Sequence, residues 1–201
     1  MPLVRRPSPP VEPAAVPPDV PLALGHGTSE QRWAAARAAA ERTDGVSLLA
    51  SALQGESDAR VREAIFTGLA RIGTAESAAA LVPYLRSDDA SLRTGAIDAL
   101  RAKPDAVRAH LATLLADPDP DVRLLSCELT RGLADGEANR LLCDLLERET
   151  EKNVCAAALE VLAEIGKAEA LPTLERCADR FASDPFIAFS IKVATDRIVR
   201  S

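Results

Sequence analysis

Aromatic residues make up only 3% of this 201-residue chain, whereas residues of the apolar class reach 47%. A core with this composition must consist mainly of Ala and Leu, which suits closely packed helices. Ten glycines without a G-X-Y period, together with only four cysteines, exclude collagen-like and disulfide-scaffold proteins. A net charge of −6 argues against a main role in binding phosphate backbones, so we expect no nucleic-acid partner.

Long apolar runs are also missing. No stretch approaches the ~18 apolar residues that cross a bilayer, and the amino terminus MPLVRRPSPP lacks the apolar run of a secretory signal. We therefore expect a cytoplasmic protein with no membrane partner. Arginine outnumbers lysine 20 to 4, and together with the abundant alanine this bias suggests a GC-rich bacterial genome.

The residues that usually carry chemistry are sparse. The cysteines Cys127, Cys143, Cys155 and Cys177 lie 16, 12 and 22 residues apart, without a C-x-x-C pair or a nearby histidine. We interpret them as small buried apolar side chains and expect no metal and no cofactor. The chain also lacks an evident nucleophile and base pair or a glycine-rich phosphate loop, so we predict no catalytic residues.

Proline is concentrated at the amino terminus. Eight of the fourteen prolines fall between Pro2 and Pro21, before the flexible sequence Gly25-His26-Gly27. Proline at this density does not propagate a helix. We therefore predict a disordered or polyproline-like tail over residues 1–27, either a plain extension or a short ligand for another protein.

From Thr28 onward the sequence repeats itself. An apolar residue followed by Arg (Cys in the last copy) recurs at intervals of 31, 30 and 32 residues, with a degenerate earlier copy near Arg32. We call its second residue the anchor; the anchors are Arg62, Arg93, Arg123 and Cys155. Mostly apolar residues follow at offsets of about 4, 7 and 10, which trace one face of a helix.

Each of these helices is followed by a turn and a second apolar run. The predicted turns are Gly73-Thr74, Lys103-Pro104, Asp135-Gly136 and Gly166-Lys167. Acidic linkers such as Asp117-Pro118-Asp119-Pro120-Asp121 then close the unit, and their Asp residues can cap the next helix. We therefore expect about five antiparallel helix pairs in residues 28–201: repeats 28–56, 57–87, 88–118, 119–150 and 151–183, then a terminal capping helix at 184–201.

The D-x-V-R sequence Asp119-Pro120-Asp121-Val122-Arg123 and the Ala-Leu-(x)-Pro starts of second helices resemble HEAT repeats. The short period is particularly similar to the phycobilisome-lyase-like HEAT subgroup. The resemblance covers residues 28–185 and implies an all-α solenoid, in which neighbouring pairs stack because one pair cannot bury both of its helices. The Trp-Leu-Gly-Tyr pattern of tetratricopeptide repeats is absent.

The resemblance does not determine a function. A hydroxylase of this fold binds two irons through paired His-Glu motifs, but this chain has only His26 and His110, neither followed by Glu. DNA glycosylases of this fold present a basic surface, whereas the second helices here carry mixed charge. A lyase-like or accessory enzyme acting on a cofactor or modified protein stays open as the alternative, and a nucleic-acid binder as a weaker one.

The anchor arginines could form a ladder of ligand-binding guanidiniums. We favour a structural role instead, in which each pairs with an Asp of the preceding linker. Because Cys155 replaces Arg in the last repeat, the ladder should end there.

Two surfaces are candidates for binding a partner protein. The first is a charged face of the second helices. Its residues are Arg108, Arg140, Asp144, Glu147, Arg148, Arg176 and Arg180. These charges either form an ordinary solvent-exposed face or bind complementary charges on a partner protein.

The second candidate is the carboxyl-terminal helix, which Asp184 should cap and Pro185 should begin. One apolar stripe (Ile187, Ile191, Ala194 and Ile198) can seal the last repeat. A second stripe (Phe186, Phe189 and Val193) needs cover from the chain itself, a partner protein or a second copy. We predict a non-catalytic scaffold, adaptor or assembly factor of a bacterial complex that uses one or both surfaces.

Overall fold

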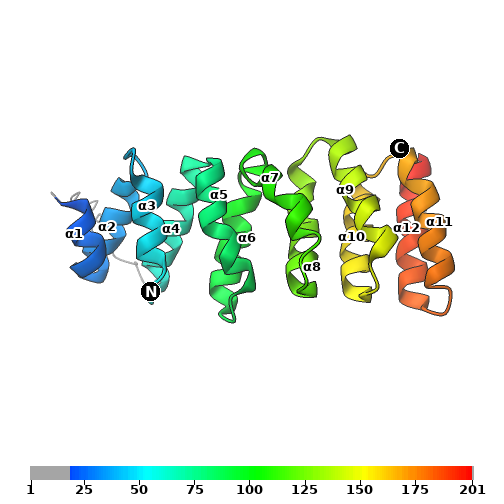
Figure 1. Cartoon of the computed structure of the whole chain (residues 1–201), viewed down its shortest axis with the longest axis horizontal. Helices are drawn as coiled ribbons and strands as arrows, with labels where there is room; N and C mark the ends of the chain where they lie inside the picture. Colours follow the sequence, from blue (N-terminus) through cyan, green and yellow to red (C-terminus); the bar gives the residue numbers. More distant parts are fainter. Residues whose placement is uncertain (1–18, 201) are drawn as a thin grey trace, which may run out of the picture. The chain divides into compact units, whose positions relative to one another are not determined.

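The computed structural model describes residues 19–200, apart from the side chain of Asp135, and consists of helices joined by short linkers (Figure 1). The chain divides into two compact units, residues 1–68 and 69–201. The division falls inside helix α4 (Ala59–Ile72). Over residues 19–200 the structure contains no strand, as the all-α prediction required.

The first unit contains α1 (Val20–His26), α2 (Ser29–Ala39), α3 (Gly45–Leu53) and the start of α4. The predicted tail is wrong for residues 20–26, because these residues form α1 and bury Val20 and Leu24. Pro21 is compatible with this helix since it lies in the first turn, where an N–H has no intrahelical partner. Residues 1–18 of the predicted tail lie outside the described residues.

Local sequence explains where these helices begin. The Asp19 carboxylate accepts a hydrogen bond from the Leu22 N–H and caps α1. Thr28 and Gln31 form a reciprocal capping box at the start of α2. On α2 the fully buried residues are alanines, including Ala35, Ala36 and Ala39. Small side chains therefore allow close helix packing where aromatics are scarce.

The second unit continues the repeat. Its further elements are α5 (Ala75–Leu81), η1 (Val82–Arg86), α6 (Ala90–Arg101), α7 (Pro104–Leu114), α8 (Pro120–Leu129), η2 (Thr130–Gly132), α9 (Asp135–Arg148), α10 (Lys152–Ile165), η3 (Ala168–Ala170), α11 (Leu171–Arg180) and α12 (Pro185–Arg200). The first helices α6, α8, α10 and α12 pack against one another in order, and second helices contact as α5 with α7 and α9 with α11 (Figure 1). The fold is an α-solenoid of helix pairs.

The turns mostly follow the expected residues. Gly73 ends α4 with a φ of 61°, a conformation that favours glycine. The prediction for Asp135-Gly136 is wrong, because the third break lies at residues 130–134 and α9 already begins at Asp135. In the second repeat Pro83 coincides with the change from α5 to the 3-10 helix η1, since proline lacks the N–H that an α-helix needs.

The repeat pattern defines the core. Residues four and seven positions after each anchor line the buried face of the first helices; examples are Leu69, Leu100, Leu159 and Leu162, each no more than 2% exposed. The linker aspartates Asp89 and Asp119 accept N–H hydrogen bonds at the starts of α6 and α8, as expected. Gly166 ends α10 at a close approach, where a Cβ would lie 2.8 Å from Ile198 Cδ1 of α12.

Candidate protein-binding site

Each linker contains a further repeated position, six residues before the anchor, that the sequence analysis did not predict. It is occupied by Glu56, Ser87, Asp117 and Glu149. The side chain at this position accepts a hydrogen bond from the N–H two residues later, at 2.8 to 3.2 Å. Its main-chain carbonyl contacts the anchor side chain. These positions share the anchors' period, which is the signal that could have identified them.

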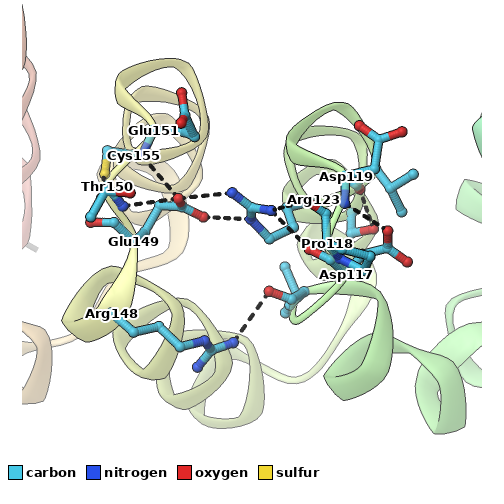
Figure 2. A network of polar contacts seen from close by, with 12 residues as sticks. Asp117, Pro118, Asp119, Arg123, Arg148, Glu149, Thr150, Glu151 and Cys155 are labelled. Atoms are coloured by element: carbon cyan, nitrogen blue, oxygen red, sulfur yellow. Dashed lines mark hydrogen bonds and ion pairs between the residues drawn. The ribbon is translucent and has the colours of Figure 1, made fainter.

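Arg123 connects two successive linkers (Figure 2). Its Nη1 donates to the Asp117 carbonyl at 2.8 Å. Its Nε and Nη2 donate to the Glu149 carboxylate at 2.6 and 3.0 Å. The predicted pairing with an Asp of the preceding linker is therefore wrong for Arg123: that linker offers carbonyls, and the bidentate carboxylate comes from the following linker.

The Glu149 carboxylate is buried yet held in its charged form. Burial alone would raise its pKa, but hydrogen bonds from Arg123 and from the N–H groups of Glu151 and Thr150 outweigh burial and lower the pKa. The same pairing raises the pKa of Arg123. In the first unit Arg32 makes the equivalent bidentate contact with Glu56, at 2.7 and 3.0 Å. These arginines serve the repeat framework, which positions the second helices.

The charged residues that the sequence places on the second helices lie on α7, α9 and α11, and each of their arginines has an acidic or main-chain carbonyl partner. We call Arg108, Arg140, Asp144, Glu147, Arg148, Arg176 and Arg180 the second-helix surface. Arg108 lies 3.0 Å from Asp105 and 3.5 Å from Glu137 of α9. Arg140 lies 3.6 Å from Asp144, with the two side chains 65% and 59% exposed.

Glu147 links α9 to α11. Its carboxylate accepts hydrogen bonds from Arg176 Nε, at 3.1 Å, and from the Thr173 hydroxyl, at 2.8 Å. Hydrogen bonds from Arg176 and then Thr173 lower the pKa of Glu147. Glu147 and Arg176 stay 40% and 58% exposed, so solvent and a partner can still reach them.

Two arginines of the second-helix surface hold neighbouring helix ends. Arg148 Nη2 donates to the Leu115 carbonyl at 3.2 Å, just beyond α7 (Figure 2). Arg180 likewise donates to the carbonyls of Leu146 and Glu147 at the end of α9. Cations are favourable at helix carboxyl ends. Arg148 and Arg180 therefore contribute to stacking of the second helices.

The last helix, α12, has two different faces. Ile187, Ile191, Ala194 and Ile198 are buried, and α12 packs on α10 and α11. On the other side Phe186 and Phe189 are 60% and 66% exposed, and Val193 is half-buried. We call Phe186, Phe189 and Val193 the aromatic patch.

Further observations concern Trp33, metal-binding groups and membrane-spanning helices. Trp33, in the first unit, is covered by the guanidiniums of Arg37 and Arg60, 4.8 and 4.4 Å from its ring centroid. Among residues 19–200 there is no group of three or more His, Cys, Asp and Glu residues that could hold a metal ion. In the same part of the chain, no helix is both long enough and apolar enough to span a bilayer.

The chain belongs to the HEAT repeat family, whose model matches residues 17–101 and 107–185. This fold is typical of protein-interaction scaffolds. The match identifies HEAT repeats in general and does not identify the phycobilisome-lyase-like subgroup.

Comparison with solved structures gives the same fold. The chain is similar to Cex1p, with 12% identity and a TM-score of 0.52 over 88% of this chain and 40% of that one. It is also similar to an engineered protein (20% identity, TM-score 0.45, 90% and 98% covered) and a designed armadillo repeat protein (15%, 0.42, 89% and 98%). Comparison with curated proteins finds no match.

Proposed function

We propose that this protein is a non-catalytic scaffold, adaptor or assembly factor of a cytoplasmic bacterial complex. It binds a partner protein through the aromatic patch of α12, with the second-helix surface as an additional contact. The observation that carries the proposal is the exposure of Phe186 and Phe189, 60% and 66%, on a helix whose opposite stripe is buried. Exposed aromatics in one patch are typical of interaction sites.

The charged residues around the patch indicate the chemistry of the partner. Lys192, Arg197 and Arg200 are exposed on α12 with only Asp196 among them. A partner that covers the aromatic patch would therefore present an apolar surface flanked by carboxylates. Such charges affect specificity and association rate more than affinity.

On the second-helix surface, Arg140 and Asp144 are the most available pair. Both are more than half exposed, and their contact is a long one at 3.6 Å. Arg148 and Arg180, in contrast, already bind carbonyls of the preceding second helix. A partner that binds the second-helix surface would mainly contact its more exposed side chains. These are Arg140, Asp144, Arg176 and the exposed part of Glu147.

The first experiment is purification of the tagged protein from its native cells, comparing partner recovery by Phe189→Asp with recovery by the unaltered chain. We expect at least a tenfold loss, because a carboxylate would be buried at the interface. Val199→Asp is the matched control, since Val199 is 68% exposed on α12 but lies outside the patch. Equal recovery by both variants would rule out the aromatic patch.

Arg140→Glu tests the second-helix surface without disturbing the helix ends. Arg148→Glu is a poorer test, because Arg148 binds the Leu115 carbonyl. We expect Arg140→Glu to slow association more than it speeds dissociation. Unchanged association kinetics with the recovered partner would remove this surface from the proposal.

Self-association through the aromatic patch is a separate outcome. In that case the purified chain would elute as a dimer in size-exclusion chromatography, and Phe189→Asp would convert it to a monomer.

Two other classes are kept as alternatives. The resemblance to the phycobilisome-lyase-like subgroup supports an accessory enzyme acting on a cofactor or modified protein, and pigment or metal in the spectrum of the purified protein would favour it. Nucleic-acid binding is weakly supported, because each arginine of the second-helix surface already has an acidic or carbonyl partner. A low-salt gel shift tests it directly.

A further inference from the structure

The exposed large apolar side chains of residues 19–200 belong to two helices, α1 and α12. Leu22 of α1 is 59% exposed, and Phe186, Phe189 and Val199 of α12 are 60%, 66% and 68% exposed. In a solenoid, neighbouring repeats cover the apolar faces of the helices between them. Within residues 19–200, α1 and α12 are the first and the last helix, and each has repeats on one side only.

The exposed side of α12 has an apolar half and a basic half. The aromatic patch forms the apolar half. Arg197 lies four residues after Val193 and Arg200 three residues later, so both continue the face of the patch. Both arginines are exposed. Together with Lys192 they give α12 three cations against one carboxylate, Asp196.

The outer side of α1 is apolar and is bordered by carboxylates. Val20 and Leu24 are buried, and α1 packs on α2 and α3. Leu22 lies two residues from each of them, on the opposite side of the helix. Asp19 and Glu30 are both exposed, and the sequence between them contains no Lys or Arg. We call Asp19, Leu22 and Glu30 the α1 end.

We propose that two copies of this chain associate head to tail, with the aromatic patch of one copy against Leu22 of the other copy. Arg197 and Arg200 of the first copy then face the carboxylates of the second copy's α1 end. The proposal rests on the proposed function, since it takes the aromatic patch as an interaction surface and names one occupant. The contact is heterologous and leaves one patch and one α1 end free, so further copies can add.

Charge favours the α1 end over a second α12 as the occupant. A symmetric contact between two α12 helices would bring the cations Lys192, Arg197 and Arg200 of both copies together, and like charges at an interface are unfavourable. The α1 end offers an exposed leucine with carboxylates beside it. It therefore complements the α12 surface both in apolar character and in charge.

The test begins with sedimentation equilibrium of the purified full chain at low salt. Each surface offers few apolar side chains, so we expect a weak contact, with the average mass rising above one chain over roughly 10 to 500 µM. Leu22→Asp and Phe189→Asp should each weaken association about tenfold or more, because each places a carboxylate in the apolar contact. Both side chains are exposed, so the fold should be kept, as circular dichroism checks. Val199→Asp is the matched control, because Val199 is exposed on α12 outside the patch.

Charge reversal tests the second half of the α12 surface. The double variant Arg197→Glu with Arg200→Glu would set carboxylates against Asp19 and Glu30, so association should weaken. Arg140→Glu makes the same kind of change on an exposed arginine of α9 and should have no effect. Unchanged association by the double variant would overturn the α1 end as the occupant.

Mixing the two apolar variants distinguishes a head-to-tail contact from a symmetric one. Leu22→Asp keeps an intact aromatic patch, and Phe189→Asp keeps an intact α1 end. Each variant should therefore stay monomeric alone, whereas a mixture with one variant fluorescently labelled should form a complex that stops at two chains. Association of Leu22→Asp alone, with no gain on mixing, would show a symmetric contact between patches and overturn the proposal.

The remaining outcomes separate this proposal from the proposed function. A chain that is monomeric at every concentration would overturn head-to-tail association. Loss of another protein's recovery by Phe189→Asp, but not by Leu22→Asp, would still support the proposed function in that case. Self-association that neither Leu22→Asp nor Phe189→Asp weakens would overturn the head-to-tail contact, because it would use a different surface.

Discussion

Two successive junctions between first helices in the second unit are built differently. Where α8 meets α10, Arg123 reaches the Glu149 carboxylate, which is 4% exposed and also accepts two main-chain N–H groups. Where α10 meets α12, the anchor position is Cys155, and the polar contact is Lys152 with Asp184 at 2.5 Å, with the lysine 64% exposed. One junction contains a buried ion pair, and the other combines apolar packing with an ion pair whose lysine is exposed.

The difference follows from one substitution in the repeat. An arginine at the anchor can bind two linkers at once. Arg123 donates to the Asp117 carbonyl of the preceding linker and to the Glu149 carboxylate of the following linker. The Cys155 side chain is too short for the second contact. The α10–α12 junction therefore depends on the isoleucines of α12.

Among the substitutions that compare the two junctions, Ile187→Ala is expected to cause the largest loss in the free energy of unfolding. Ile187 is fully buried at the α12 junction, so its truncation should reduce the free energy of unfolding by about 3 to 4 kcal/mol. Urea unfolding followed by circular dichroism measures it; Trp33 is in the other unit and is a poor reporter. Phe189→Ala is the matched control on the exposed face, with an expected change within about 0.5 kcal/mol. Equal effects would mean that the two faces of α12 are assigned incorrectly.

Glu149→Gln should have the next largest effect. The amide can still accept the Thr150 and Glu151 N–H groups, but it leaves Arg123 without its carboxylate, at a cost of about 2 to 3 kcal/mol. Asp184→Asn, at the other junction, should cost less, because its Lys152 partner is exposed. A double-mutant cycle of Glu149→Gln with Arg123→Met isolates the pair. A larger loss from Asp184→Asn than from Glu149→Gln would reverse the comparison.

The fold was largely predictable because its signals are local and periodic. Offsets of four and seven from the anchors identify the buried face of each first helix, and linker aspartates mark the helix starts. The third break was misplaced because Asp135 and Gly136 resemble a turn but begin α9. Helix α1 was missed because prolines before and within it obscure a short apolar face formed by Val20 and Leu24.

The candidate site was less predictable, because its contacts join residues of different repeats. Arg123 has Asp119 near it in sequence but binds Glu149, 26 residues further on, since stacking of α8 on α10 decides which carboxylate it meets. The stripe of α12 needed no such information, and its buried and exposed residues match the helical spacing.

Acidification should change the stability of the protein less than these substitutions do, but it tests the two ion pairs specifically. The pKa of Glu149 is lowered from the ordinary value of 4.5, so its contribution to stability is complete above about pH 4.5 and is lost as pH falls through the lower pKa of the folded state. The gap in stability between the unaltered chain and Glu149→Gln should therefore shrink on acidification, as urea unfolding at successive pH values can measure.

The pKa of Asp184 is also lowered, first by the hydrogen bond from Lys152, so Asp184→Asn should show the same sign of pH dependence. Salt separates the two junctions. Added sodium chloride should screen the Lys152–Asp184 pair, because its lysine is 64% exposed, whereas the Arg123–Glu149 pair, at 15% and 4% exposed, should keep its pH dependence. If salt abolishes the pH dependence of both pairs equally, the Glu149 carboxylate is not shielded from solvent, and the contrast between the two junctions fails.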